Sequence, residues 1–260
     1  MKLDFYHWAY QCPLNHEMAG LLKRYSDRLD ISLHDVGETP ALAVKMEMYY
    51  PTLTVVAGRF RFYSPLTPAF LDALCRGEVP SETPYRPRLG TKEAVGELTP
   101  ITAENCFAAS GCTGKSCAEN SARKREFLRG QGLTVYGYMN VRGGELLGGA
   151  EYLPSLLVPY DIPKHPRTAF LTCVYRSDEE FDYKTAPLRA LEAYLAKEYD
   201  KLVAVSDEDG VFPNGDRSFF IRNGYKDQGV LARGPYCTLH LMEKICGKKA
   251  SAFEYTNRIY

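Results

Sequence analysis

A stretch rich in proline and glycine divides the chain after its first third, and this break constrains what the sequence can fold into. Few large aliphatic residues occur between residues 78 and 100, a stretch that contains Pro80, Pro84, Pro87, Gly90, Gly96 and Pro100. This composition is typical of a linker. We therefore expect two unlike domains, residues 1–78 and residues 100–260, joined by a Pro/Gly-rich linker over residues 79–99.

The N-terminal segment predicts alternating strands and helices. Residues 3–10 are apolar and aromatic like a buried strand, and after Pro13 apolar residues recur at the spacing of one helix face. Further strands are expected over residues 29–34, 52–56 and 60–63, and further helices over residues 40–48 and 67–74. The predicted order is β-α-β-α-β-β-α.

That order, together with two proline motifs, resembles the thioredoxin fold over residues 1–78. Cys12-Pro13 ends the first strand, and Tyr50-Pro51-Thr52 begins the third. The resemblance implies a cis-proline that faces a redox cysteine. The family's C-x-x-C pair is incomplete because position 15 is Asn15, which excludes dithiol exchange within the motif.

Cys12 is nevertheless a redox candidate. The dipole and free N–H groups at a helix N-terminus favour a thiolate, so Cys12 could be a monothiol of lowered pKa, with His16 as a charge partner. Exchange without a resolving cysteine needs an external thiol. The alternative is an idle cysteine in a module for docking or dimerisation.

The C-terminal segment predicts a loop and a helix, followed by a mixed set of strands and helices. The hairpin signal is the Gly143-Gly144 turn. Strands are expected over residues 133–141, 146–153, 169–175, 202–205 and 236–242, and helices over residues 118–128, 188–199 and 218–223.

Over about residues 100–245 these elements resemble the GNAT-type N-acetyltransferases. The sequences that carry the resemblance are MNVRGGELLGGAEYLP, FLTCVYRS and SFFIRNGYKDQG. It implies an α/β domain with a mixed, splayed central sheet, in which strand 170–175 separates from strand 203–206. Acyl-CoA would lie in the resulting slot.

The resemblance also implies how acetyl-CoA would be held. The pantetheine arm would pair with the backbone after Cys173, and the pyrophosphate would bind N–H groups at the start of the next helix. The residues implied for cofactor binding are Val174, Tyr175, Lys184, Thr185 and Ala186.

The expected pyrophosphate loop departs from the family pattern because its glycines are replaced. Thr185 and Pro187 stand at the glycine positions, and Pro187 has no N–H to offer. Asp182 adds negative charge, whereas Lys184 and Thr185 could donate from their side chains. The sequence leaves open whether a CoA site is weakened or lost.

Two residues are candidates for catalysis. Acyl transfer needs a base that takes a proton from an ammonium group, and the resemblance places Glu151 on the strand beside the slot for this role. The alternative for Glu151 is a solvated position at a strand edge. Tyr225 is the second candidate, although many relatives have an apolar core aromatic there. Phe219 and Phe220 occupy the region of the family's acid tyrosine.

Three further cysteines lie close together in the sequence, namely Cys106, Cys112 and Cys117. Their spacing is not a zinc signature, because structural zinc sites use close C-x2-C pairs. A fourth ligand would have to come from elsewhere, such as Cys12 or His16. A labile thiol cluster and local packing are both open, and no metal is predicted.

The charge balance limits the classes of partner. Lys plus Arg is 32 and Asp plus Glu is 32, so no net field would hold the chain on nucleic acid or on an anionic membrane. No uncharged apolar run reaches the roughly 18 residues of a membrane span, and Asp4 interrupts a signal-like start. We expect a cytoplasmic protein, and a homodimer is compatible with it.

Three functions are therefore considered. The first, which we favour from the sequence, is CoA-dependent transfer of an acetyl group to an amine of a small molecule or peptide. The second is a non-catalytic, thiol-based binding or sensing protein with a degenerate CoA site. The third is a monothiol redox protein that uses Cys12. Resemblance of fold does not decide among them.

Overall fold

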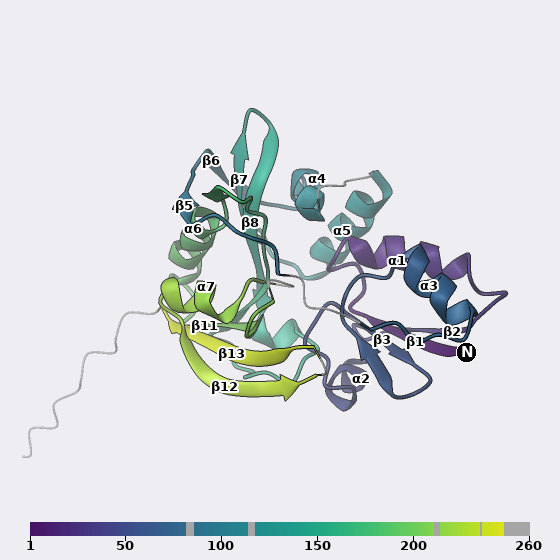
Figure 1. Cartoon of the computed structure of the whole chain (residues 1–260). Coiled ribbons are helices and arrows are strands. Elements are labelled where there is room, and N and C mark those ends of the chain that lie inside the picture. The colour runs from purple at the N-terminus through teal and green to yellow at the C-terminus, as the bar shows by residue number, and fades with distance from the viewer. Residues whose placement is uncertain (82–85, 114–117, 211–213, 235, 247–260) are drawn as a thin grey trace, which may run out of the picture.

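The computed structural model describes residues 1–81, 86–113, 118–210, 214–234 and 236–246. Figure 1 shows the elements before residue 80 gathered on one side of the molecule, next to a larger sheet formed by the rest of the chain. No helix within these residues is both long and apolar enough to cross a membrane.

The first unit is a four-stranded sheet with three helices. Its strands have the order β2-β1-β3-β4, in which β1 is parallel to β2 and antiparallel to β3. The elements are β1 (Lys2–His7), α1 (Leu14–Lys23), β2 (Asp30–Asp35), α2 (Pro40–Lys45), β3 (Thr52–Val56), β4 (Phe60–Phe62) and α3 (Pro68–Cys75). The predicted element order is confirmed, while the thioredoxin-like assignment stays a prediction.

Local sequence explains these elements. Helix α1 buries Met18, Leu21 and Leu22 at helical spacing against the sheet. Helix α3 begins after Thr67, whose hydroxyl accepts a hydrogen bond of 3.2 Å from the Phe70 N–H.

The second unit is built on a larger mixed sheet. Within the described residues its strand order is β12-β13-β11-β9-β8-β7-β6. The strands are β6 (Glu97–Ile101), β7 (Gly137–Arg142), β8 (Glu145–Pro154), β9 (Thr168–Tyr175), β11 (Lys201–Asp207), β12 (Lys226–Arg233) and β13 (Thr238–Ile245). The helical elements are α4 (Cys106–Ala109), η1 (Ser110–Thr113), α5 (Ala118–Gly130), η2 (Ser155–Leu157), α6 (Thr185–Leu195) and α7 (Arg217–Arg222).

Strands β9 and β11 separate along their length. They pair in parallel only from Thr168 to Phe170 and from Lys201 to Val203, whereas the strands continue to Tyr175 and Asp207. The mixed, splayed sheet that was predicted is therefore present. Helices α6 and α7 lie on one side of the strands, and α4 and α5 lie on the other (Figure 1).

The linker prediction is wrong for part of residues 79–99. Strand β5 (Lys92–Glu93) pairs in parallel with β10 (Phe181–Asp182), and β6 forms an edge of the large sheet. Proline is tolerated on an edge strand, which explains why Pro100 lies in β6. Proline and glycine residues, which suggested a linker, thus occur here in and beside an edge strand of the sheet.

The two units share one apolar core. Trp8 packs edge-on against Tyr160, with ring centroids 5.4 Å apart, and Val36, Leu53, Phe170 and Leu239 belong to the same buried cluster. Both segments contribute side chains to this core. The domain boundaries 1–78 and 100–260 therefore stay a prediction.

Candidate functional site

The gap between the splayed strands is filled by a side chain of the chain itself. The N–H of Val174 donates to Asn214 Oδ1 at 3.1 Å, and Asn214 Nδ2 donates to the Val205 carbonyl at 3.0 Å. Asn214 is only 1% exposed. Its amide therefore joins β9 to β11 at the place where a pantetheine arm was expected to pair.

A carboxylate of the chain lies at the N-terminus of α6. The N–H groups of Lys184 and Thr185 donate to Asp182 Oδ1 at 2.9 and 3.1 Å, and the Thr185 hydroxyl donates to Asp182 Oδ2 at 2.6 Å. A negative charge at this end of a helix is stabilised by the free N–H groups and the helix dipole. Asp182 thus takes the position that was predicted for a phosphate.

A segment that we call the strap, residues 86–94, covers the loop before α6. The Gly90 N–H donates to the Asp178 carbonyl at 2.7 Å, and the Ala94 N–H donates to the Asp182 carbonyl at 3.1 Å. A Cβ atom at Gly90 would lie 2.1 Å from the Glu180 carbonyl carbon, so only glycine permits this approach.

A pocket of about 210 Å³ opens between the strap, the start of α6 and α7. Lys184 lines it and is only 5% exposed. Its ammonium lies 4.1 Å from the centre of the Phe219 ring, within cation–π range. Burial lowers the pKa of Lys184, although Asp182 and Asp216 oppose the change.

These residues do not fit CoA in the predicted mode. The N–H groups of Val174 and Thr185 are already bound by the chain, and Ala186 is buried in the first turn of α6. Pro187 offers no N–H. Tyr175 packs among the residues of α4 and β7, where burial raises its pKa. Of the five predicted cofactor residues, Lys184 alone lines the pocket.

Glu151 lies in the interior and not at a solvated edge. Its Oε1 is 2.7 Å from Lys124 Nζ of α5, and 3% and 2% of the two side chains are exposed. Burial by itself lowers the pKa of Lys124, but the Glu151 carboxylate outweighs this effect and the pKa is raised. The ammonium thus holds the carboxylate that was predicted to act as a base.

Tyr225 is a core residue and does not share a site with Glu151. Its hydroxyl donates to Glu192 Oε1 of α6 at 2.9 Å, and burial raises its pKa well above the ordinary value. Glu151 contacts α5 on the opposite side of the sheet. The two predicted catalytic residues therefore contact helices on opposite sides of the sheet.

Cys12 lies where the two units meet, and the residue is partly exposed there. Burial raises its pKa to about 12, with a smaller contribution from Cys112, so the expected lowering at the helix N-terminus does not occur. Cys173 also has its pKa raised by burial. Because both thiols are neutral, they are poor nucleophiles. The prediction of a low-pKa monothiol is wrong.

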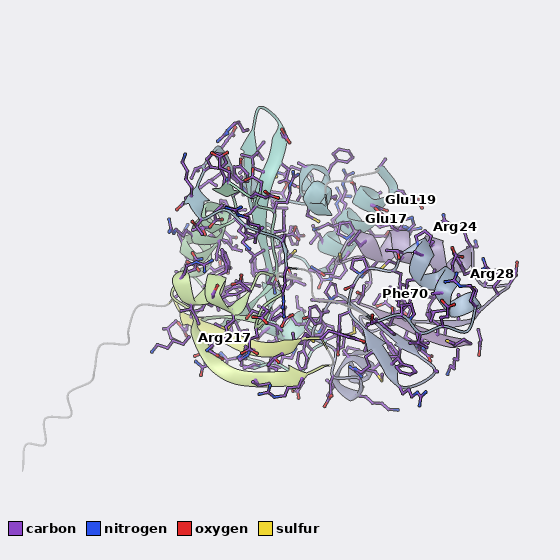
Figure 2. All side chains as sticks on the ribbon, in the orientation of Figure 1. Glu17, Arg24, Arg28, Phe70, Glu119 and Arg217 are labelled. Atoms are coloured by element: carbon purple, nitrogen blue, oxygen red, sulfur yellow. The ribbon has the colours of Figure 1, made fainter. Side chains whose placement is uncertain are left out.

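His16 interacts with α5 and does not serve as a charge partner of Cys12. Its Nε2 lies 3.1 Å from Glu119 Oε1, and Asn120 donates to Glu17 at 2.7 Å. Figure 2 labels Glu17 and Glu119 at this junction of α1 and α5. These contacts hold the first unit against the second.

The cysteines do not form a metal centre within the described residues, where no group of three His, Cys, Asp or Glu side chains could hold a metal ion. Cys106 is buried, and its thiol donates to the Ala103 carbonyl at 3.4 Å, which indicates local packing. Cys117 lies outside the described residues.

Sequence reasoning missed two of the residues that shape the site. Asn214 belongs to an Asn-Gly-Asp turn signal, and nothing in that signal predicts a bridge between strands. Lys124 sits in a strongly polar helix, so its burial against Glu151 had no signal in the spacing. Asp182 was recognised as a negative charge in the loop, but its hydrogen bonds to the N–H groups at the start of α6 were not predicted.

No protein-family model matches the sequence, and no curated protein matches it. Among solved structures, an aminoglycoside 6'-N-acetyltransferase from Enterococcus faecium is 14% identical, with a TM-score of 0.41 over 58% of this chain and 97% of that one. An N-acetyltransferase from Staphylococcus aureus is 14% identical, with a TM-score of 0.42 over 58% and 98%. The yncA protein of Salmonella typhimurium, solved with its cofactor acetyl-CoA, is 12% identical, with a TM-score of 0.41 over 60% and 96%. This likeness is one of fold and assigns no activity to the chain.

Proposed function

We propose that the chain is a non-catalytic binding or sensing protein built on a GNAT-like fold with a thioredoxin-like N-terminal unit. The observation that carries the proposal is the hydrogen bonding of Asp182 to the first N–H groups of α6. Thiol exchange at Cys12 is not part of this proposal, because burial raises the pKa of Cys12 to about 12. A cytoplasmic location and a homodimer stay predictions.

Electrostatics supports a closed cofactor site. Two like unit charges about 4 Å apart near a protein surface repel by about 4 kcal/mol, and a pyrophosphate would meet the Asp182 carboxylate at this range or closer. A pantetheine arm would also have to displace the amide of Asn214, which bonds both splayed strands. Both displacements would expose donors that are now satisfied.

Calorimetric titration of the reduced protein with acetyl-CoA and with desulfo-CoA tests the proposal. We expect no heat up to millimolar ligand for the natural chain and measurable binding for a variant with Asp182→Ala and Asn214→Ala. Asp178→Ala is the matched control, because Asp178 binds N–H groups in the same loop without contacting α6. Micromolar binding by the natural chain would overturn the proposal.

A second candidate is CoA-dependent acetyl transfer to an amine of a small molecule or peptide. It is favoured by the separation of β9 from β11 and by the pocket at the start of α6. In this case acetyl-CoA would bind in the titration above, after Asp182 and Asn214 had changed their contacts. A screen of amine acceptors, with and without Glu151→Gln, would then follow.

A further inference from the structure

The side chain of Lys184 is almost fully buried and lines the pocket. Its Nζ makes no hydrogen bond or ion pair with another described residue, and it lies 4.1 Å from the centre of the Phe219 ring. A Cβ at Gly215 would lie 3.0 Å from Nζ, so the absence of a side chain there leaves room for the ammonium. A cation in this situation has lost most of its water, and Asp182 and Asp216 offset the loss only in part, because its pKa is still lowered.

The pocket that Lys184 lines also contains an arginine and a threonine, whose side chains can donate hydrogen bonds. Arg222 of α7 lies at the exposed rim, and Thr91 comes from the strap. Asp182 and Asp216 also line the pocket, but their carboxylates accept hydrogen bonds from the starts of α6 and α7. Lys184 and Arg222 are the cationic side chains of this lining; one guanidinium nitrogen of Arg222 donates to Ser218 Oγ at 2.8 Å, and its other N–H groups are available to a ligand.

The size of the pocket selects the class of ligand. Its volume of about 210 Å³ is below the range of about 300 to 1,000 Å³ that drug-sized ligands and cofactors occupy. A carboxylate or phosphate group fits such a space and offers the acceptors that a lysine and an arginine need. Burial lowers the pKa of Lys184, and a bound anion would restore the charged form.

We propose that this pocket binds a small oxyanion, a carboxylate or a phosphate monoester, through Lys184 at its base and Arg222 at its rim. This inference names the ligand class of the binding function proposed above and rests on it. It differs from a pyrophosphate site on the helix backbone, because Asp182 already holds those N–H groups.

Thermal unfolding of the full chain, titrated with sodium phosphate and separately with sodium acetate, tests the proposal. Sodium chloride at equal ionic strength controls for screening. We expect a saturable rise in Tm with one of the two oxyanions and none with chloride. Lys184→Met should weaken the apparent affinity at least tenfold, and Arg222→Gln should weaken it less.

Lys197→Met is the matched control, because Lys197 also lies over an aromatic ring, that of Tyr194, but is exposed. It should leave the affinity unchanged. Absence of a saturable shift, or equal affinity in the natural chain and Lys184→Met, would overturn the inference. If Lys184→Met does not fold, Arg222→Gln decides: an unchanged affinity in this variant would then overturn the inference. An acetyl-CoA arm separates the two proposals: micromolar acetyl-CoA binding defeats the proposed function, whereas failure of both oxyanions without such binding defeats only this inference.

Discussion

Lys124 and Glu151 form an ion pair that is almost completely removed from solvent, with Nζ and Oε1 2.7 Å apart. The pair links α5 to β8. Since both charges have lost their water, each depends on the other for its solvation. This dependence makes the pair a structural element as well as the site of the predicted base.

Glu151→Gln should therefore unfold the protein more easily. Removing one partner of a buried pair costs about 3 to 5 kcal/mol, because the other charge is left uncompensated. Urea unfolding followed by circular dichroism measures the loss. Glu243→Gln is a matched control, since Glu243 pairs with Lys201 at 2.8 Å on the surface of the sheet, and there the cost should be under about 1 kcal/mol.

A double variant separates pairing from packing. Replacing Lys124 and Glu151 together by Met and Leu should recover most of the stability lost in Glu151→Gln. If Glu151→Gln is as stable as the natural chain, the two side chains do not form the pair described above. In any acyl-transfer assay, lost activity in Glu151→Gln would have to be corrected for the folded fraction.

Cys12 should resist alkylation in the folded protein. Its pKa is raised to about 12 because the thiol is buried, so almost no thiolate is present at pH 8. Iodoacetamide labelling at pH 8, followed by peptide mass spectrometry, checks this. Cys75, which like Cys12 is partly exposed, serves as the comparison. Labelling of Cys12 at the rate of Cys75 would show that it is reactive after all.

Buried strands were easier to predict from the sequence than exposed ones. Strands β9 and β11 are apolar on both faces and were identified from the sequence, whereas β12 is an exposed edge strand with bulges and was not. Helix α6 was expected from residue 188 but begins at Thr185, because the Asp182 carboxylate binds its first N–H groups.

The site was less predictable than the fold because it depends on contacts between distant segments. Glu151 and Lys184 were recognised as important residues, yet their partners come from α5 and α7. The closure of the slot depends on a single side chain, Asn214, whose partners in the two strands are 40 and 9 residues away in sequence. Spacing within a sequence carries no signal for such contacts.

Gly90→Ala should detach the strap from the loop before α6. The new Cβ would lie 2.1 Å from the Glu180 carbonyl carbon and must push the backbone apart, at a cost of about 1 to 3 kcal/mol. Limited proteolysis should then cut within residues 86–94 sooner than in the natural chain. An unchanged cleavage pattern and unchanged stability would mean that the strap does not rest on Glu180.

Gly20→Ala is the control for that substitution. Gly20 lies within α1, and no atom comes within 4 Å of a Cβ placed there. Because glycine is a poor helix former, alanine should stabilise the protein by about 0.5 to 1 kcal/mol. The opposite signs at the two glycines separate a steric effect from a general response to alanine.

Lys164 should make the stability of the protein increase with pH in the alkaline range. Burial lowers its pKa from 10.5 to about 8, and its ammonium donates to the Ser155 carbonyl at 3.0 Å. Between about pH 8 and pH 10.5 the unfolded chain binds more protons at this residue than the folded chain does, so stability rises with pH across that window.

Urea unfolding at pH 7.5, 9 and 10 measures the slope. Lys164→Gln should remove this part of the slope, whereas the same change at the exposed Lys226 should leave it. If Lys164→Gln and the natural chain have parallel pH profiles, the ammonium of Lys164 is fully solvated and its pKa is not lowered.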